Sequence, residues 1–532
     1  MATHEVLNQA PPLDVDPLAS DPALQGALVR EGAAWAQADV QALGNAVFTR
    51  EAREWAAQAN ESPPRLRTHD RYGHRIDEVD FHPAWHELMR LSMSFGVHGR
   101  PWREPREGAH VARAAMMMLV SQNESGHGCP ISMTYSAYPA LQKTPALLAE
   151  WGPRITAESY DARFQPASQK RSALIGMAMT EKQGGSDVRA NTTRAERVEG
   201  GFRLTGHKWF CSAPMSDAFL VLAQAPQGLS CFLLPRFTPD GARNRMFLQR
   251  LKDKLGNRSN ASSEIELDGA WAMLAGEEGR GVQTILEMVN HTRLDCVIGA
   301  AAMMRRSLVE AVHHARHRRA FGKLLVDQPA MQGVLADLAI ESFAATTLMM
   351  RLSRAYDRSE APFRRLATAV SKYWVCKRAP AFVAEALECL GGNGYVEESG
   401  LPRIYREAPL NSIWEGSGNV MCLDVLRAIA REPAAVEALV DELRAGKGAD
   451  RRLDAFVDAV LAEVARPEEE TARRLVERLA LALQGTLLVR HGPAVISDAF
   501  CASRLTGDRG LAFGTLPRAV PAASVVQAAV AL

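Results

Sequence analysis

Residues 176–187 read Gly-Met-Ala-Met-Thr-Glu-Lys-Gln-Gly-Gly-Ser-Asp, and this stretch guides the interpretation of the whole chain. Its Gly-Gly-Ser turn exposes backbone N–H groups, which can hold a phosphate or a ring oxygen without obstruction by side chains. The hydroxyls of Thr180 and Ser186 can add hydrogen bonds. The glycine spacing fits neither a Walker A loop nor a dinucleotide fingerprint. Taken alone, the stretch predicts either a cofactor loop or a structural turn beside a strand.

The next stretch along the chain, residues 206–212, reads Gly-His-Lys-Trp-Phe-Cys-Ser. A Trp-Phe pair near the edge of a sheet can form a wall for one face of a flat aromatic cofactor. Ordinary packing within a strand is the alternative.

A third stretch, residues 411–419, reads Asn-Ser-Ile-Trp-Glu-Gly-Ser-Gly-Asn. Glu415 follows Ile413 and Trp414 and precedes a glycine. Apolar surroundings disfavour the charged form of a carboxylate, which makes a glutamate a useful base near neutral pH. The alternative is a glutamate that interacts with the dipole at a helix start.

Around these stretches the residue periodicity divides the chain into five segments and predicts an α+β multidomain protein. Residues 1–22 resemble an extended arm, and residues 23–173 show mostly helical spacing. Residues 174–280 contain short alternating or apolar runs bounded by turns, which predict a β domain. Helical spacing returns in residues 281–430, including a helix over about 364–390 that stops at Gly391-Gly392, and residues 431–532 form a helical extension.

The composition excludes several classes of protein. The 62 basic and 61 acidic residues almost cancel, so any surface for a polyanion must be local. The eight cysteines form neither a CxxC pair nor zinc-like spacing with histidines, which predicts buried thiols in a reducing compartment and no metal site. Because neither a signal peptide nor an uninterrupted run of ~18 apolar residues is present, we expect a cytoplasmic protein without a membrane span.

The three stretches, in this order, resemble the acyl-CoA dehydrogenase superfamily over roughly residues 80–430. Further matches are Arg318-Arg-Ala-Phe-Gly322, Gly391-Gly-Asn-Gly-Tyr395 and Arg403 with Arg406-Glu-Ala408. The strings at 179–187, 251–262, 411–419 and 421–427, with the arm and the extension, are similar to the AidB-like branch of alkylation-response flavoproteins. The resemblance implies an N-terminal all-α domain, a middle β-sandwich or barrel and a C-terminal four-helix bundle.

The resemblance also implies FAD as the cofactor and Glu415 as the base that removes a proton α to a thioester carbonyl while the β-hydride goes to the flavin. Arg318 would reach the FAD of a neighbouring subunit in a homotetramer. The residues expected to contact FAD are Met177, Ala178, Met179, Thr180, Gly185, Ser186, Trp209, Phe210, Cys211, Ser212, Arg318, Ile413, Trp414, Gly416, Ser417, Asn419 and Leu423.

The chain departs from the usual dehydrogenase pattern at four positions. Cys211 stands where the family has a threonine that bonds the flavin, and Ser417 replaces a threonine. Pro329 occupies the place of a glutamine, with Gln328 just before it. Trp414 replaces a tyrosine, and its bulk would narrow the acyl pocket. FAD binding is therefore expected, with reduced turnover of fatty acyl-CoA.

AidB-like proteins bind double-stranded DNA, and their C-terminal region is implicated. Residues 471–532 carry seven arginines against three acidic residues, a net charge of +4. Phosphate contacts by such side chains would be independent of sequence and sensitive to salt. An ordinary solvated helix face is the alternative. The candidate DNA contacts are Arg427, Arg473, Arg474, Arg478 and Arg518.

Three functions follow as hypotheses. The first is an FAD protein that binds duplex DNA and protects it from alkylating agents, with weak acyl-CoA dehydrogenase activity. The second is a catabolic dehydrogenase for short or branched acyl-CoA, of the isovaleryl-CoA type, without a role on DNA. The third is a flavin oxidase of this fold acting on a nitroalkane-like substrate.

Overall fold

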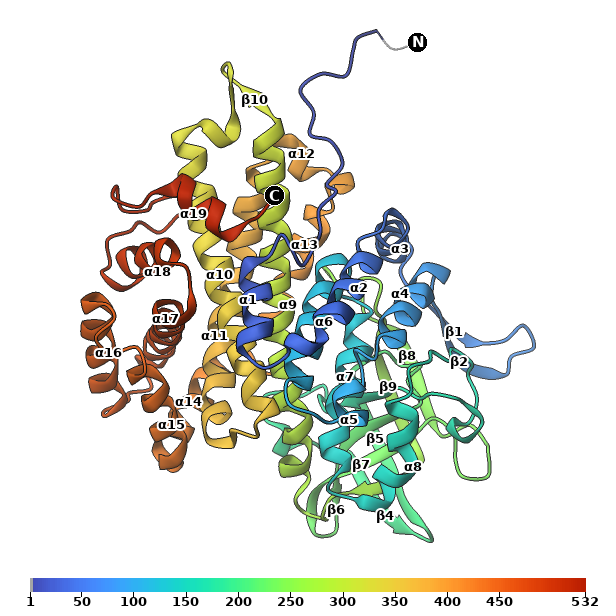
Figure 1. The fold of residues 1–532 in the computed structure, drawn as a ribbon. Coiled ribbons are helices and arrows are strands. Elements are labelled where there is room, and N and C mark those ends of the chain that lie inside the picture. Colours follow the sequence, from blue (N-terminus) through green and yellow to red (C-terminus); the bar gives the residue numbers. More distant parts are fainter. Residues whose placement is uncertain (1–2) are drawn as a thin grey trace. The chain divides into compact units, whose positions relative to one another are not determined.

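The computed structural model describes residues 3–532 and divides the chain into two compact units (Figure 1). The helical unit contains the residues up to 45, residues 107–122 and residues 296–532. The sheet unit contains residues 46–106 and 123–295. The helices expected within residues 23–173 are therefore shared between the two units. The bounds of the five segments inferred from the sequence remain predictions.

The sheet unit is built on one seven-stranded sheet. Its strands are β3 (Ile175–Ala178), β4 (Arg194–Val198), β5 (Gly201–Ser212), β6 (Ala218–Ala225), β7 (Gly228–Pro235), β8 (Met246–Leu251) and β9 (Ser262–Ala275). The order is β3-β6-β4-β5-β9-β7, and β7 pairs again with β6 while β8 pairs with β9. The sheet thus closes on itself, which confirms the predicted middle β domain and gives it a barrel-like form.

The interior of the barrel is filled by apolar side chains that alternate along its strands. Phe202, Phe219 and Phe232 are buried there together with aliphatic residues of β8 and β9. The register between β5 and β9 shifts twice, the second time between Lys208 and Cys211. A bulge re-aims the side chains next to it. The irregularity at Trp209 and Phe210 therefore lies where the sequence predicts the flavin wall.

Helices and a hairpin accompany the sheet. They are α3 (Arg50–Glu61), α4 (Pro83–Ser94), α5 (Arg100–Arg103), α7 (Gly128–Leu141) and α8 (Pro145–Ile155), with the hairpin β1 (Arg65–His69) and β2 (Arg75–Asp80). Thr49 caps α3 through the backbone N–H of Ala52. The hairpin corrects the expectation that this part of the chain is helical. Its turn is stabilised by Asp70, whose carboxylate accepts hydrogen bonds from the N–H groups of Tyr72 and His74.

The helical unit contains four long or central helices, α9 (Gly281–His317, from residue 296 on), α10 (Pro329–Asp357), α11 (Ala361–Glu388) and α14 (Gly418–Arg431). The thiol of Cys376 donates to the carbonyl of Cys296 at 3.4 Å and so joins α11 to α9. Helix α11 ends three residues before Gly391. Gly391 has φ of 59°, a conformation that glycine adopts at lower energetic cost than other residues. These helices match the predicted four-helix segment.

The unit contains further helices besides these four. They are α1 (Pro22–Arg30), α2 (Gln37–Val47, up to residue 45), α6 (Ala109–Asn123, up to residue 122), α12 (Gly392–Tyr395), α13 (Leu401–Glu407), α15 (Pro433–Arg444), α16 (Arg451–Val464), α17 (Ala472–His491), α18 (Ala494–Phe500) and α19 (Ala522–Ala529). Helix α17 packs against α10, α11, α14, α15 and α16, and α19 packs on α10 (Figure 1). The predicted helical extension is thus integrated with the four-helix core.

Two further features bear on the class of protein. By length and composition, α10 is the one helix among residues 3–532 that could cross a membrane, but 89% of its apolar window is buried inside the protein, as in a core helix. All eight cysteines are buried free thiols, as the sequence analysis predicted.

Candidate active site

The first two sequence motifs lie side by side in the sheet unit. The backbone N–H of Trp209 donates to the carbonyl of Thr180 at 2.8 Å. A second link runs from the backbone N–H of Lys182 to Nε2 of His207 at 3.0 Å. The fold therefore joins the Gly-Gly-Ser loop to the Trp-Phe end of β5, two segments that the sequence only shows in order.

A completely buried ion pair ties these segments together. Nζ of Lys208 lies 2.7 Å from Oε1 of Glu181, and both side chains are 0% exposed. Glu181 also accepts hydrogen bonds from the backbone N–H and hydroxyl groups of Thr192 and Thr193. Burial opposes ionisation of Glu181, but Lys208 and these donors outweigh it and hold the pKa of the carboxyl well below its usual range. Glu181 thus anchors the loop, and its side chain is completely buried.

The loop that follows is open and fits the phosphate or ring oxygens of a flavin cofactor. Gly185 and Ser186 are exposed, and their backbone N–H groups donate to no other residue within 3–532. A Cβ on Gly185 would come within 2.6 Å of Oγ1 of Thr180. Only glycine lets the backbone come so close to that hydroxyl, so the predicted pair Thr180 and Gly185 forms one compact cradle.

Only part of the predicted flavin wall, formed by Trp209 and Phe210, is open to a ligand. Phe210 is 49% exposed, whereas Nζ of Lys252 lies 3.3 Å from the ring centroid of Trp209 and covers one of its faces. Cys211 belongs to the core of the barrel, where burial raises the pKa of its thiol to about 12. Oγ of Ser212 is 3.4 Å from Oγ of Ser262. Any contact between Cys211 and the flavin must therefore come from its backbone.

The other predicted contacts of this unit lie at β3. Met177 and Ala178 pair with Leu220 and Val221 of β6, and Met179 follows directly. Ala178 is fully buried, so only its backbone can face a ligand, while Met177 and Met179 are partly exposed.

The predicted catalytic loop lies in the helical unit, between a 3₁₀ turn (Leu410–Ser412) and α14. Glu415 has φ of 58° and Gly416 has φ of 107°, so two consecutive residues adopt left-handed conformations. For a glutamate this conformation costs on the order of 1 kcal/mol or more. Such strain persists only where surrounding contacts impose it, and it is typical of functional sites.

Lys372 of α11 supplies those contacts. Its Nζ donates to the carbonyl of Trp414 at 2.8 Å and also to the carbonyl of Gly416. The side chain is buried, so the two bonds hold the backbone on both sides of Glu415 in a water-poor setting. The indole N–H of Trp414 donates to Oδ1 of Asn411 at 3.0 Å. Sequence reasoning missed Lys372, although a lysine within the apolar run of a core helix was a visible signal.

The residues that follow Glu415 lie on two faces of α14, one buried and one exposed. Gly418, Met421, Cys422 and Val425 are buried. The exposed face of α14 carries Asn419, Leu423 and Arg427, spaced four residues apart, and Ser417 is exposed just before the helix. Ile413 is 62% exposed. Two predicted flavin contacts and the best DNA candidate thus share one face of a helix, about 12 Å from end to end.

Arg318 lies next to a short hairpin, β10 (Arg319–Ala320) and β11 (Lys323–Leu324). The N-terminal arm holds this hairpin through Asn8, whose carbonyl accepts from Nη1 of Arg318 at 2.6 Å and whose side chain bonds the backbone of Arg319. The side chain of Gln328 donates to the carbonyl of Ala320 at 3.0 Å. At the tip, Phe321 is 99% exposed and has φ of 52°.

The arginines of the extension are less available than their number suggests. Arg504 is buried against Asp337 and Glu341, Arg490 pairs with Glu442, and Arg478 pairs with Glu463. These carboxylates lie outside residues 471–532, so the net charge of that segment overstates its attraction for phosphate. Of the predicted DNA contacts, Arg427, Arg473, Arg474 and Arg518 are exposed, whereas Arg478 is partly buried.

A Ser-His-Glu arrangement elsewhere in the sheet unit carries no catalytic role. Nε2 of His127 is 2.9 Å from Oγ of Ser92, and its Nδ1 is 2.7 Å from Oε2 of Glu124. All three residues are at most 3% exposed, so a substrate cannot reach the serine hydroxyl. Glu124 also accepts from Asn60 and Ser259, which identifies the group as a structural network.

The predicted site residues therefore form two sets, one in each unit. Residues 177–186 and 209–212 belong to the sheet unit, and residues 318 and 413–423 belong to the helical unit. That both sets face one cofactor remains a prediction.

Comparison with known families accounts for most of the chain. The N-terminal domain of the adaptive response protein AidB matches residues 8–162. The middle domain of acyl-CoA dehydrogenases matches residues 176–270, and their C-terminal domain matches residues 279–430.

Individual relatives agree with these matches. The chain is 48% identical to the AidB protein of Escherichia coli (strain K12) over 507 residues, which cover 94% of each chain. It is 32% identical to acyl-CoA dehydrogenase family member 11 of Caenorhabditis elegans over 74% of this chain and 66% of the other. The crystal structure of Caenorhabditis elegans ACDH-11 in complex with C11-CoA superimposes with a TM-score of 0.85 at 27% identity, covering 95% of this chain and 94% of that one.

Proposed function

Because this chain belongs to the AidB branch of the acyl-CoA dehydrogenase family and is an FAD-dependent oxidoreductase of that type, we propose that Glu415 is its catalytic base and that it binds duplex DNA to shield it from alkylating agents. The observation that carries the catalytic part is the strained loop at Glu415, held on both sides by the buried ammonium of Lys372. The DNA part rests on the exposed arginines of the helical unit.

In the proposed reaction the residues of this chain position the substrate and move one proton. The carboxylate of Glu415 takes the proton from the carbon α to the thioester carbonyl of an acyl-CoA. FAD, when bound, supplies the acceptor for the β-hydride. Lys372 keeps the backbone of the loop in place, so the carboxylate needs little reorganisation when it accepts the proton. The bulk of Trp414 next to the base favours a small acyl group and slow turnover of long ones.

The proposed DNA surface centres on exposed arginines that lack a close carboxylate partner. Arg427 is 60% exposed, and its nearest carboxylate, on Asp424, is 4.0 Å away. Arg474 is exposed on α17 and has no ion pair among the described residues. Arg473 lies over the ring of Tyr373 and remains exposed. Such guanidinium groups contact phosphates without reading sequence, which fits protection of any duplex.

The DNA proposal predicts salt-sensitive binding to a random duplex. Each phosphate contact contributes about 0.9 to the slope of log affinity against log salt, so replacing Arg427 or Arg474 by alanine should lower the slope by about 1. Fluorescence anisotropy over a series of salt concentrations measures it. Arg50→Ala is the matched control, because Arg50 is a 92% exposed arginine of the sheet unit. Negligible affinity of the wild-type protein at low salt would remove the DNA proposal.

The competing functions have their own signature. Rapid anaerobic bleaching of the flavin by a short branched acyl-CoA, together with no DNA binding, would identify a catabolic dehydrogenase. Bleaching by a nitroalkane and not by acyl-CoA would identify an oxidase.

We also infer that the protein is a homo-oligomer assembled through the tip of the β10–β11 hairpin. A phenylalanine that is 99% exposed in a strained turn is costly in a monomer, and the arm and Gln328 both hold the hairpin in this form. In the homotetramer implied by the family, this hairpin carries Arg318 toward a neighbouring subunit.

Replacing Phe321 by serine should therefore shift the protein toward smaller species. A buried aromatic anchor contributes roughly 2 kcal/mol or more to an interface, which raises the dissociation constant about 30-fold or more. Sedimentation velocity at micromolar concentration measures the change. Leu511→Ser, at another fully exposed apolar residue, should leave the assembly intact. A wild-type protein that is monomeric under these conditions contradicts the inference.

A further inference from the structure

The sheet unit contains a cavity of about 270 Å³ that is separate from the residues predicted to hold FAD. It lies between the end of β2, the start of α4, the connection 156–174 and the turn after β5. That connection contains only one short 3₁₀ turn, and long irregular segments of this kind are usually functional. The volume is slightly below the range of about 300–1,000 Å³ typical of drug-sized ligands, so the cavity suits a smaller molecule.

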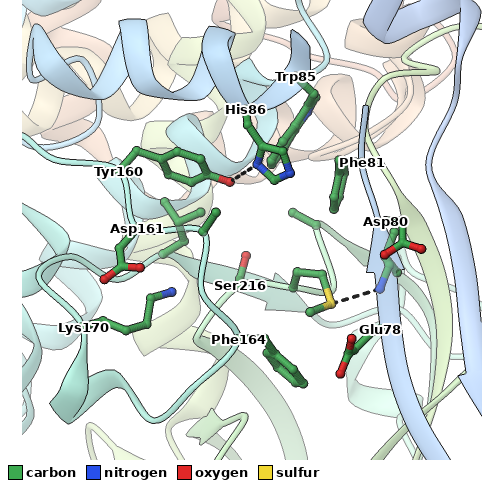
Figure 2. A pocket seen from close by; sticks show the side chains of 15 residues that line it. Glu78, Asp80, Phe81, Trp85, His86, Tyr160, Asp161, Phe164, Lys170 and Ser216 are labelled. Atoms are coloured by element: carbon green, nitrogen blue, oxygen red, sulfur yellow. Dashed lines mark hydrogen bonds between the residues drawn. The ribbon is translucent and has the colours of Figure 1, made fainter. Parts of the chain in front are cut away.

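Five rings contribute to the wall, those of Phe81, Trp85, His86, Tyr160 and Phe164. Phe81 stacks on Trp85 with centroids 4.0 Å apart, and His86 stacks on Tyr160 at 5.8 Å. Figure 2 shows these rings and that of Phe164 arranged around an open centre, with the Tyr160 hydroxyl bonded to Nδ1 of His86 at 2.8 Å. Ring walls of this kind favour a flat ligand, because aromatic pairs gain energy from offset or edge contacts beyond area burial.

The charged groups at the cavity are neutralised by partners of their own. Glu78 and Asp80 pair with Arg67, and Asp161 pairs with Arg163. Lys170 pairs with Asp217 at 2.7 Å, with both side chains buried. Burial lowers the pKa of His86, which keeps its ring neutral at physiological pH. A charged ligand would thus lose hydration without gaining a countercharge.

Two buried polar groups at the cavity lack a hydrogen-bond partner among the residues that the structure describes. They are the indole N–H of Trp85 and the hydroxyl of Ser216, which are 4% and 1% exposed as residues. Figure 2 shows the Ser216 hydroxyl pointing into the open centre. An indole N–H can only donate, so it requires an acceptor atom. Leaving both groups unpaired is unfavourable, and a suitable ligand would satisfy them.

We propose that this cavity binds a small uncharged aromatic ring that carries a carbonyl oxygen, such as an aryl amide. The ring lies in the open centre of the cavity, against the rings of Phe81, Tyr160 and Phe164. Its carbonyl oxygen accepts from one of the two unpaired groups, and an N–H of the amide can pair with Ser216.

The test measures the binding of three probes of nearly equal size to the FAD-loaded protein by isothermal titration calorimetry. Benzamide should bind saturably, with a dissociation constant on the order of 1 mM or tighter. Benzoate tests the exclusion of charge and should bind at least ~10-fold more weakly. Cyclohexanecarboxamide tests the need for a planar ring and should also bind more weakly. Equal affinity for all three probes, or no saturation by benzamide, would overturn the proposal.

Variants locate the binding. Ala162→Phe, at an exposed position that lines the cavity, should abolish benzamide binding, while Ala242→Phe, in an exposed turn that does not line the cavity, should not. Ser216→Ala and Trp85→Phe should each weaken binding up to ~10-fold. An unchanged flavin spectrum shows that a variant is folded. Wild-type affinity in Ala162→Phe would place the ligand elsewhere and end the proposal, even if the Trp85 variant fails to fold.

Discussion

Replacing Glu415 by glutamine should slow the reduction of the bound flavin by a short branched acyl-CoA about 10²- to 10⁴-fold, the contribution of a positioned general base. Glutamine keeps the size of the side chain but cannot take the proton. The content of FAD and its absorption spectrum should remain unchanged. Anaerobic stopped-flow bleaching of the yellow flavin band measures the rate.

The control for this substitution is Glu398→Gln, which neutralises an exposed carboxylate of the same unit and should leave the rate unchanged. Bleaching at the wild-type rate in Glu415→Gln would show that another group is the base.

Lys372→Met then distinguishes the proton transfer itself from the positioning of the base. It should lower kcat about 10- to 100-fold with little change in KM, because a loosened loop misplaces the carboxylate without removing it. A change in KM alone would assign Lys372 to substrate binding.

The largest loss of stability is expected from breaking the ion pair between Glu181 and Lys208. Removing one partner leaves a buried charge without compensation, which costs about 3–5 kcal/mol. Lys208→Met should therefore lower the denaturant midpoint of the sheet unit and weaken FAD binding, because Glu181 anchors the predicted flavin loop. Tryptophan fluorescence in urea and the FAD content of the purified protein measure the two effects.

A double-mutant cycle tests the assignment. The pair Glu181→Gln with Lys208→Met should be less destabilised than the sum of the single changes, since no charge is left unpaired. The exposed pair Arg50 and Glu54 is the control, and its removal should cost less than ~1 kcal/mol. Additive effects at Glu181 and Lys208 would contradict the role of the pair.

The same carboxylate predicts an acid limit to stability. The pKa of Glu181 is lower in the folded protein than its ordinary value of 4.5, so the unfolded chain binds the proton more readily. The stabilisation is complete above about pH 4.5 and is lost as the pH falls toward the folded pKa. Glu181→Gln should remove this part of the pH dependence, and unfolding curves from pH 3 to pH 7 measure it.

Several local elements were predictable because their signals are local. The β domain expected over residues 174–280 contains strands β3 to β9, and the helix expected to stop at Gly391-Gly392 ends at Glu388. The hairpin β1–β2 was missed, since its strands are short and rich in charged residues such as Arg65 and Arg67. Their alternation of exposed and half-buried side chains becomes visible only when β8 and the barrel lie beneath them.

The amino-acid sequence by itself determined the order of the elements, the family and the residue types at the flavin and base motifs, because these depend on short-range periodicity and on spacing within a few residues. The tertiary structure decided which charged side chains are paired with other groups inside the protein. Lys208 meets Glu181, Lys372 meets the loop of Glu415, and Arg504 meets Glu341 only after distant segments fold together. A formal charge counts toward a ligand only if no nearer partner neutralises it, and that is a property of positions in space.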